Sequence, residues 1–600
     1  MATLDELITM ANESAAECSP ETGESAPAEP NRYYRTGIDW LGKPPVIPEE
    51  KITETFEADV IVVGGGHAGT QLAVRGAQLG LTDMIVVEAQ REKTHTYLGE
   101  DLGVWNSKWV ADKGFGPYDT GEVIYEYVKR TAGRVNPDII ASYVKNAGRM
   151  FDNMIDIVNS YGDEKGILNF GGGDDGTVII QCQKDYETGS TRYDYPIELS
   201  GFKTWATTVQ FMGEISHTPI RPIAVRTNLP VFQNYGKRFS MERGVRWHFA
   251  TKGVVLSQDD AGAVTGLIAQ RRGEDSYIRY IARKAVCVTT GDFSANRDMI
   301  WALLTENSEW AERLGMEKRQ LMGLSGRDGS GHKMCCWAGG LIEPSPRPTD
   351  QNGDCPPSPW GQSPMCWLNA YGRRFTNEAA VTLTLGTMAR QPKGLMCTIT
   401  DSRYMKSICL AGVEHGGPNY GRPCYYDELE QDMSHVVDAG REGYPVRCCT
   451  VVERMPTTVY GSNDLAELLD FIGYTGKAKE AALESIARYN ELCYKGADED
   501  FGKDKKAMIP IDRPPFYACV TNFEKRSHAK VGLNTLAGVV TDLDFNVLDA
   551  EGEPIPGLYV AGNTLGQRFG TNYATPCAGS SIGSAMTNGF VLAETLAKKQ

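Results

Sequence analysis

The sequence predicts an α/β fold in which one sheet is built from both ends of the chain and a second domain is inserted between them. Three observations lead to this prediction. A run of β-branched residues at 59–63 enters a glycine-rich turn and a helical pattern, and a second apolar strand at 84–87 ends before an acidic residue. Strands of the same kind recur at 285–289 and, near the end of the chain, at 558–561. The intervening stretch 342–510 has no such junction of strand and glycine.

The composition is that of an ordinary globular protein with an acidic surplus. The 600 residues include 61 Lys and Arg against 77 Asp and Glu, a formal net charge of −16, and 41% are hydrophobic. An acidic chain without a basic block repels phosphate backbones, so we expect no nucleic-acid partner. No uninterrupted apolar run approaches the roughly 20 residues that span a bilayer, so we expect no membrane insertion.

The first thirty residues carry seven acidic side chains and no Lys or Arg, which is the opposite of a secretory or transit sequence. We therefore expect an acidic flexible tail and lead-in at 1–50 and a cytoplasmic location. Fifteen cysteines are scattered without a Cys-x-x-Cys pair. That pattern predicts reduced thiols and argues against a disulfide framework, an iron–sulfur cluster or any other metal site.

The glycine-rich turn after the first strand has the spacing G-x-G-x-x-G, formed by Gly64, Gly66 and Gly69. It follows a strand, opens a helix and is answered by Glu88, 24 positions after Gly64, at the end of the next strand. The first glycine permits the tight turn, the second lets the backbone approach a pyrophosphate, and the third allows close helix packing. Helix N-terminal amides favour the phosphates, and Glu88 would accept hydrogen bonds from the adenosine ribose. The turn therefore predicts a dinucleotide site without separating NAD from FAD.

Four further motifs resemble those of one flavoprotein superfamily. They are Val-Thr-Thr-Gly-Asp-Phe at 288–293, Gly-Arg-Asp-Gly-Ser-Gly-His at 326–332, Gly-Arg-Arg-Phe-Thr-Asn-Glu at 372–378 and Pro-Gly-Leu-Tyr-Val-Ala-Gly-Asn at 556–563. With the glycine turn, they occur in the order typical of the fumarate reductase/succinate dehydrogenase flavoproteins, from about residue 57 to the C-terminus. The resemblance implies a Rossmann-like FAD-binding domain formed by 51–341 and 511–600, with an α+β capping domain at 342–510.

The resemblance also implies which residues hold FAD. The glycine turn and Glu88 would bind the ADP half, 290–291 would line it, and Asn563 would face the ribityl chain. The helix that begins near Ser580 would direct its N-terminal amides at the flavin pyrimidine ring, although Gly-Ser-Ser is also an ordinary helix start. The residues implied to bind the cofactor are Gly64, Gly65, Gly66, Ala68, Gly69, Glu88, Asn106, Val255, Thr290, Gly291, Asp328, Gly562, Asn563, Ser580, Ser581 and Ile582.

His95 raises the question of a covalent flavin. The run Thr94-His95-Thr96, whose His lies seven residues after Glu88, resembles a Ser-His-Thr of relatives in which the His is bonded to the flavin. The residues that follow, 97–103, depart from the pattern of those relatives. We therefore expect non-covalent FAD, with a covalent link through His95 as the alternative.

The chemistry-bearing positions differ from those of the fumarate-reducing relatives. Those relatives carry an Arg just after the Phe-x-Asn-Glu run and a second Arg close to the C-terminal Asn. Here 379–382 are Ala-Ala-Val-Thr, and Tyr573 follows Asn572. A small dicarboxylate demands paired cationic groups, so we do not expect one as substrate. The end of the chain is instead similar to 3-ketosteroid dehydrogenases and related enone reductases, which place a Tyr shortly before the last helix, although the spacing here is two residues longer.

Tyr573, Arg568 and His528 are the candidate catalytic residues. A Tyr hydroxyl can polarise a carbonyl or move a proton at the α-carbon, although Tyr573 could equally be a packed ring. Arg568 would orient a carbonyl or carboxylate, the alternative being a surface or phosphate-facing Arg. His528 lies near the substrate His of fumarate-reducing relatives, but the divergent sequence after it favours a structural role. For Arg374 and Glu378 the sequence favours a buried ion pair.

We therefore expect an FAD-dependent oxidoreductase acting on CH–CH groups, which reduces or forms a C=C bond conjugated to a carbonyl in a hydrophobic, ring-bearing small molecule such as a 3-ketosteroid. Hydride would pass between flavin N5 and the β-carbon, and a Tyr would transfer the proton. The alternatives are a reductase of unsaturated or aryl carboxylic acids, an amine or amino-acid oxidase, and a flavin-bearing redox sensor.

The electron source is not encoded by a second nucleotide turn. The glycine run Gly171–Gly176 leads into an apolar strand-like run rather than a helix, and it therefore predicts a hairpin loop. We expect electrons to come from a separate carrier or from NAD(P)H.

Overall fold

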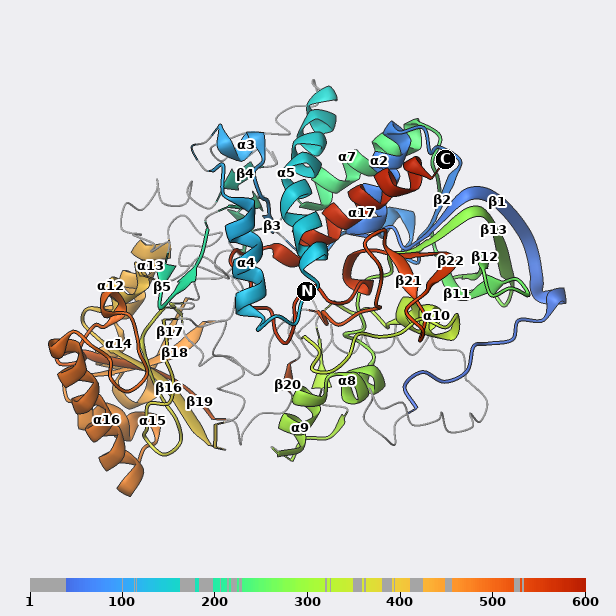
Figure 1. Ribbon diagram of the computed structural model, residues 1–600. Helices are drawn as coiled ribbons and strands as arrows, with labels where there is room; N and C mark the ends of the chain where they lie inside the picture. Colours follow the sequence, from blue (N-terminus) through green and yellow to red (C-terminus); the bar gives the residue numbers. More distant parts are fainter. Residues whose placement is uncertain are drawn as a thin grey trace.

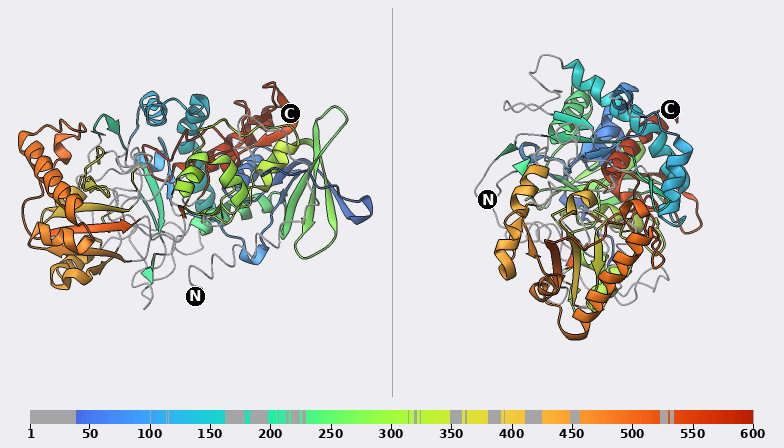
Figure 2. Two further views of the ribbon diagram at one scale, coloured as in Figure 1. Left: turned by 90° about the horizontal axis from the view of Figure 1, so that it is seen from below. Right: turned by 90° about the vertical axis from the view of Figure 1, so that its left-hand side faces the viewer.

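The computed structural model describes residues 39–99, 101–112, 114, 116–161, 179–182, 198–205, 207–212, 215–216, 224–225, 229–313, 315–318, 321–323, 325–348, 359–360, 363–379, 391–392, 394–410, 425–447, 456–522, 529–530 and 534–599. Its two main sheets lie at opposite ends of an elongated molecule, with helices packed around and between them (Figures 1 and 2). The larger sheet is at the right of Figure 1 and the smaller one at the left.

The larger sheet has the strand order β10 (Arg246–His248), β2 (Met84–Val87), β1 (Ile52–Val63), β13 (Tyr277–Val288), β12 (Val264–Arg271) and β11 (Thr251–Gln258). The last residues of β13 pair in parallel with β22 (Pro554–Val560), which pairs with β21 (Asn546–Leu548). The strands β10, β2, β1, β13 and β22 run parallel to one another. A strand from the end of the chain thus joins a sheet begun near its start, which confirms the predicted fold class.

The burial of β1 explains why the glycine turn lies inside the molecule. Residues 52–57 alternate between half-buried and exposed, whereas Val60–Val63 are all buried. Such an uninterrupted apolar stretch is typical of a parallel strand covered on both faces. The helices α2 (His67–Gln78) and α17 (Ser580–Lys598) pack against each other to the left of the sheet in Figure 1, with α5 (Pro137–Ser160) and α7 (Leu229–Glu242) beside them. The helix α10 (Ser330–Trp337) packs on β11.

The smaller, antiparallel sheet has the order β15 (Cys366–Leu368), β16 (Leu395–Asp401), β19 (Phe516–Asn522), β18 (Thr457–Ser462) and β17 (Tyr444–Val446). Alternate residues of β19 face opposite sides, as the strand repeat dictates. Tyr517 and Cys519 pack with α12 (Tyr404–Ile408), α13 (Tyr425–Met433) and α14 (Val436–Ala439). Phe516 and Ala518 pack with α15 (Leu465–Ile472) and α16 (Gly476–Lys495). This sheet therefore includes a strand that lies beyond the domain boundary expected at residue 510.

The remaining described elements are shorter or lie outside the two main sheets. They are the small sheet β3 (Asp101–Gly103), β7 (Thr208–Met212) and β4 (Ile179–Cys182); the strand pairs β5 (Glu198–Leu199) with β6 (Phe202–Lys203), β8 (Ile215–Ser216) with β9 (Ala224–Val225) and β14 (Leu321–Met322) with β20 (Ala529–Lys530); the helices α3 (Lys108–Ala111), α4 (Thr120–Arg130), α8 (Arg297–Leu303) and α9 (Thr305–Arg313); and the 3₁₀ turns η1 (Glu49–Lys51), η2 (Glu92–Thr94), η4 (Gly440–Glu442), η5 (Lys505–Ala507) and η7 (Gly562–Thr564).

Two predictions fall outside the described residues, namely the acidic tail up to residue 38 and the hairpin loop at Gly171–Gly176. Among the helices that the structure describes, none combines the length and the apolar character needed to cross a bilayer.

Candidate active site

The glycine turn forms a backbone cradle at the end of β1. Gly64 has a φ of 103°, a conformation that favours glycine, and its N–H donates to the Val87 carbonyl over 2.8 Å. A β-carbon at Gly69 would overlap the Gly64 carbonyl oxygen, so α2 can start this close to the turn only with glycine there. At Gly66, by contrast, a β-carbon would meet no atom of the described residues within 4 Å. The turn is thus tight towards the protein and open at Gly66, as a bound pyrophosphate requires.

Glu88, which follows β2, is 5% exposed and ties the glycine turn to the next loop. Its two carboxylate oxygens accept the N–H groups of Gly65 and Gln90, each over 2.7 Å. Each oxygen has a further lone pair, which can accept a ribose hydroxyl. Trp247 of β10 covers the turn so closely that a β-carbon at Gly65 would overlap its ring. Glu88, the residue predicted to bind the ribose, is therefore buried and held in place by the glycine turn and the loop that follows β2.

The ends of β13 and β22 meet beside the glycine turn. The Thr564 hydroxyl lies 3.4 Å from that of Thr290 and donates to the Gly291 carbonyl over 2.9 Å. Gly562 has a φ of 73°, and a β-carbon there would lie 2.9 Å from the β-carbon of Ala68. The structure thus brings these implied cofactor residues together at one edge of the sheet.

Arg327 is a cation of this site that the sequence analysis did not single out. A β-carbon at Gly291 would lie 3.4 Å from its side chain. Burial lowers the pKa of His67, the first residue of α2, to about 4, and the charge of Arg327 adds to that effect. A guanidinium beside the turn favours the phosphates of a dinucleotide. Its signal was present in the sequence as the Arg inside the motif 326–332.

The side chain of Asn563 lies at the N-terminus of α17. Gly579, with a φ of 71°, precedes the helix, and its carbonyl accepts the Gly103 N–H of β3 over 2.9 Å. Ser580 is buried, with its hydroxyl 2.7 Å from the hydroxyl of Tyr127. The Ser581 hydroxyl donates to Asn563 Oδ1 over 3.3 Å. The residues implied for the flavin end of the cofactor therefore form one group at this helix N-terminus.

Tyr573 and Arg568 belong to the same group. Tyr573 is 5% exposed, and its hydroxyl accepts the N–H of Ser581 over 2.8 Å. Arg568 is buried and donates to Ser584 Oγ over 2.9 Å and to Asn563 Oδ1 over 2.8 Å. Burial lowers the pKa of this guanidinium to about 10. Arg568 thus holds Asn563 from inside the fold, whereas the Tyr573 hydroxyl lies directly at the helix start.

Asn106 and Asp328 have protein partners of their own. Asn106 is exposed, has a φ of 53°, and exchanges hydrogen bonds with the backbone of Tyr118 over 2.7 and 3.0 Å. Asp328 accepts from Lys252 Nζ over 2.6 Å and from the N–H of Ser330, the first residue of α10, over 3.0 Å. Each residue orders its own loop, and their contact with FAD stays a prediction.

The remaining candidate residues are Val255, Ile582 and His528, and none of them belongs to the glycine turn. Val255 is half-buried in β11 and pairs with Ile268 of β12. Ile582 lies in the first turn of α17, where its side chain occupies the space beside Gly99. His528 lies outside the described residues, so its suggested role stays a prediction.

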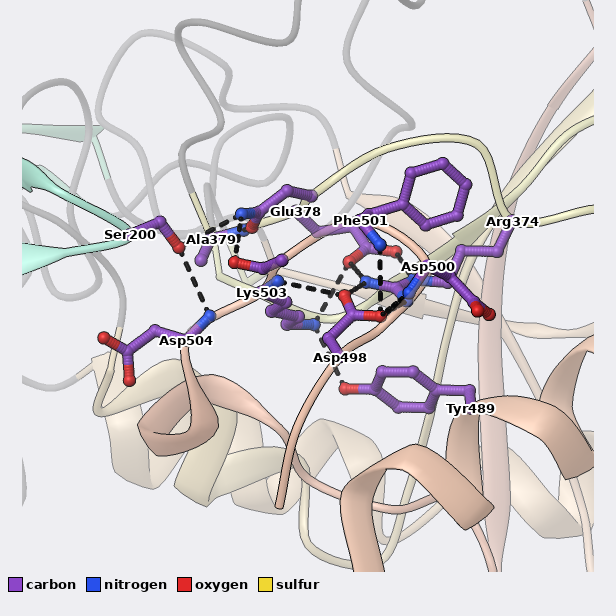
Figure 3. Close-up of polar contacts among 12 residues, drawn as sticks. Ser200, Arg374, Glu378, Ala379, Tyr489, Asp498, Asp500, Phe501, Lys503 and Asp504 are labelled. Atoms are coloured by element: carbon purple, nitrogen blue, oxygen red, sulfur yellow. Dashed lines mark hydrogen bonds and ion pairs between the residues drawn. The ribbon is translucent and has the colours of Figure 1, made fainter. Parts of the chain in front are cut away.

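The inserted region contains a second buried polar group, which is fully paired (Figure 3). Arg374 donates to Glu378 over 2.8 and 2.9 Å and to Asp498 over 2.7 and 2.9 Å. Lys503 lies 3.3 Å from the Glu378 carboxylate and donates to the Tyr489 hydroxyl over 3.1 Å. The four charged side chains are at most 5% exposed. The expected buried ion pair of Arg374 and Glu378 is confirmed, as part of a larger network.

These features fit an FAD molecule. The open space at Gly66 and the N-terminus of α2 suit its pyrophosphate, and the carboxylate of Glu88 suits its ribose. The N-terminal amides of α17 suit the electron-rich edge of a reduced flavin ring. The structure therefore groups residues that suit both ends of the cofactor, and their individual contacts with FAD stay predictions.

Comparisons with known proteins agree with this reading. The family model described as FAD binding domain matches residues 59–582. Vinyl phenol reductase of Lactiplantibacillus plantarum is 23% identical to this chain over 540 residues, which cover 88% of this chain and 94% of that protein. Urocanate reductase of Eggerthella lenta is 22% identical over 553 residues, which cover 90% of this chain and 75% of that protein.

Solved structures share the fold at low sequence identity. A 3-ketosteroid Δ4-(5α)-dehydrogenase from Rhodococcus jostii RHA1 has a TM-score of 0.59 and 17% identity, with 92% of this chain and 99% of that chain covered. A flavocytochrome c3 fumarate reductase has a TM-score of 0.52 and 15% identity, with 96% and 85% covered. These findings confirm the resemblance to the fumarate reductase flavoproteins. The chain belongs to the FAD binding domain family and is an FAD-dependent oxidoreductase.

Proposed function

We propose that this oxidoreductase reduces a C=C bond conjugated to a carbonyl in a hydrophobic, ring-bearing small molecule such as a 3-ketosteroid. The observation that carries the proposal is the position of the Tyr573 hydroxyl, 2.8 Å from the N-terminal amide of Ser581 in the group that includes Asn563. A hydroxyl next to the predicted flavin end can act on the carbonyl or the α-carbon of an enone. The fold shared with ketosteroid dehydrogenases agrees with this substrate class.

The residues near the start of α17 would have separate roles in such a reaction. Bound FAD supplies the hydride, from N5 of its reduced form to the β-carbon. Tyr573 donates the proton to the α-carbon, and the N–H of Ser581 stabilises the phenolate that remains. Arg568 holds the Asn563 amide in place through its 2.8 Å hydrogen bond. In the desaturating direction Tyr573 would instead accept the proton from the α-carbon.

The absence of paired arginines from the family positions supports an apolar ketone over a dicarboxylate. Residues 379–382 are Ala-Ala-Val-Thr, and Tyr573 occupies the position after Asn572. Binding two carboxylates without two cationic partners would leave buried charges unpaired, at a cost of several kcal/mol. We also propose that the inserted region, around the smaller sheet, covers the substrate as a capping domain.

Anaerobic photoreduction tests the proposal directly. The reduced enzyme is mixed with a 3-keto-4-ene steroid, a simple aryl enone or fumarate, and the return of flavin absorbance is followed. We expect rapid re-oxidation by at least one enone, with a product two hydrogens heavier than the substrate. Re-oxidation by fumarate and by no enone would contradict the proposal. Peroxide release in air upon addition of amines would instead support the amine oxidase alternative.

A vinyl phenol is the second candidate substrate, because vinyl phenol reductase aligns over 88% of this chain. Its vinyl group is conjugated to a phenol ring, so hydride addition to the outer carbon and protonation of the inner carbon, or the converse, again need a positioned acid. The same photoreduction assay with 4-vinylphenol decides between the two classes. Faster re-oxidation by 4-vinylphenol than by any ring enone would favour the vinyl phenol.

The buried cysteines argue against the alternative of a flavin-bearing redox sensor. Burial raises the pKa of Cys336, Cys397 and Cys577 to about 12, which keeps them as unreactive thiols at neutral pH. Electrons would come from a separate carrier or from NAD(P)H. Multiple turnovers with a reduced dye as donor would contradict the sensor function.

A further inference from the structure

His95 is buried in an aromatic pocket beside the glycine turn. It follows η2 and is 7% exposed. Its ring centroid lies 4.8 Å from that of Tyr97, 5.5 Å from Phe249 and 6.0 Å from Trp247. Trp247 is the residue that covers Gly65, so His95 lies at the same end of the cradle as Glu88. A polar ring in such a pocket needs hydrogen-bond partners for both of its nitrogens.

Lys237 of α7 fixes the proton of this imidazole. Its ammonium lies 3.2 Å from His95 Nδ1. An ammonium can only donate, so Nδ1 must be the accepting nitrogen and the ring proton must be on Nε2. Burial also lowers the pKa of His95, against the opposing charge of Glu88, which favours the neutral ring. The pocket therefore presents an imidazole N–H whose direction is set by the protein.

Although it is buried, this N–H makes no well-formed hydrogen bond among the described residues, and the backbone of Gly65 lies close enough to raise the pKa of the ring. A buried donor without a well-formed hydrogen bond destabilises the apoprotein, so a ligand that provides an acceptor is stabilised there. Glu88 offers the complementary group, since its carboxylate oxygens keep lone pairs after accepting from Gly65 and Gln90. A donor and an acceptor side by side match a ribose diol, in which one hydroxyl accepts while the other donates.

We propose that His95 binds a ribose hydroxyl of the adenosine half of FAD through Nε2, paired with Glu88 and oriented by Lys237. The same nitrogen is then engaged by the ribose and forms no bond to the flavin ring. FAD is accordingly held without a covalent link, and the Thr94–Thr96 motif serves the opposite end of the cofactor from the one its relatives suggest. This inference rests on the cofactor alone and not on the identity of the substrate.

Reconstitution of the apoprotein with separate halves of the cofactor tests the proposal. ADP and FMN are used as probes beside FAD, and dissociation constants are measured by calorimetry. For His95→Ala we expect about tenfold weaker binding of FAD and ADP, the value of one hydrogen bond, and unchanged binding of FMN. Lys237→Met should produce a smaller loss of the same kind, because it removes only the group that fixes the ring proton. His95→Asn, which keeps a donor, should recover part of the affinity for ADP.

The ribose hydroxyl can be identified with deoxy analogues. With one of the two analogues, 2′-deoxy-ADP or 3′-deoxy-ADP, the His95→Ala substitution should cause no further loss of affinity, because the hydroxyl that binds His95 is already missing. His248→Ala is the matched control, since this half-buried His of β10 already pairs with the Tyr280 hydroxyl over 2.9 Å. Its ADP affinity should equal that of the wild type.

Three results would overturn the proposal. The first is ADP affinity that does not change in His95→Ala. The second is an equal loss for FMN and ADP, which indicates a general structural role. The third is yellow colour that stays with the protein after acid precipitation of the wild type and disappears in His95→Ala, which would establish the covalent link instead.

Discussion

The molecule contains two buried polar groups that differ in how completely they are paired. In the group Arg374, Glu378, Asp498 and Lys503 of the inserted region, every charge has an opposite charge within 3.3 Å (Figure 3). In the nucleotide cradle, the space at Gly66 is open, and the buried imidazole N–H of His95 makes no well-formed hydrogen bond among the described residues. The comparison teaches that complete pairing accompanies a structural role in the first group, whereas open space beside an incompletely paired polar group accompanies the predicted ligand site in the second.

The electrostatic cost of each group follows from this difference. A buried ion pair returns its desolvation cost only while both partners are present, so the network around Arg374 constrains how the polypeptide folds. The cradle costs stability in the apoprotein and recovers it when the cofactor binds. Substitutions in the first group should therefore affect unfolding, and substitutions in the second should affect cofactor affinity.

Gly66→Val should have the largest effect, because its side chain would occupy the space that the pyrophosphate needs. We expect apoprotein after purification, with FAD affinity reduced by more than about a hundredfold. The thermal unfolding of the apoprotein should stay that of the wild-type apoprotein, since a β-carbon at this position meets no described atom within 4 Å. A variant that keeps stoichiometric FAD would show that the cofactor does not pass over this turn.

Arg374→Met should destabilise the inserted region and leave FAD affinity unchanged. Removing one partner of a buried ion pair costs about 3–5 kcal/mol, because Glu378 and Asp498 would lose their bidentate partner. Urea unfolding measures the change. The control is Arg488→Met, whose ion pairs are half-exposed and should cost less than about 1 kcal/mol. Equal losses in the free energy of unfolding for the two variants would show that the buried network contributes no more to stability than the exposed ion pairs.

The pH dependence of unfolding should reveal the same network. Burial alone would raise the pKa of Asp498, but hydrogen bonds from Arg374 and from backbone amides outweigh it and lower the pKa to about 2. A lowered carboxyl pKa stabilises the fold above the ordinary value near 4, and the stabilisation is lost as pH falls towards 2. In Arg374→Met this acid-dependent loss should be smaller. Parallel pH profiles of wild type and variant would show that the pair does not set the pKa.

The smallest effect should come from the β5–β6 hairpin, which bonds to α4 as well as to the inserted region. The Ser200 hydroxyl accepts from Asn377 Nδ2 over 3.1 Å and from the Asp504 N–H over 3.3 Å. Ser200→Ala should cost about 1 kcal/mol and increase hydrogen exchange at Asp504 and its neighbours in η5. Ser276→Ala is the control, because it removes only an exposed hydrogen bond to Glu274, and it should change neither quantity. Unchanged exchange in Ser200→Ala would show that the hairpin does not hold the inserted region.

The sequence predicted the strands and the glycine turn of the larger sheet more fully than the tertiary contacts of the candidate active site. The run Val60–Val63, the glycine turn and Glu88 were predictable because a local pattern of strand, turn and helix specifies each of them. The partnership of Lys237 with His95 was not, because α7 reaches the ring only through tertiary packing across 142 positions of sequence. Likewise β19 joins the smaller sheet through strands far from it in sequence, so no local signal marks its membership.

The most direct test of the account is the single-turnover re-oxidation of photoreduced Tyr573→Phe by an enone that re-oxidises the wild type. The account predicts that the variant keeps stoichiometric FAD, because only a hydroxyl is removed from a ring that packs beside α17. It predicts that re-oxidation slows by about a hundredfold or more, the usual scale for the loss of a general acid. Re-oxidation at the wild-type rate would contradict the account and move the proton donor away from Tyr573.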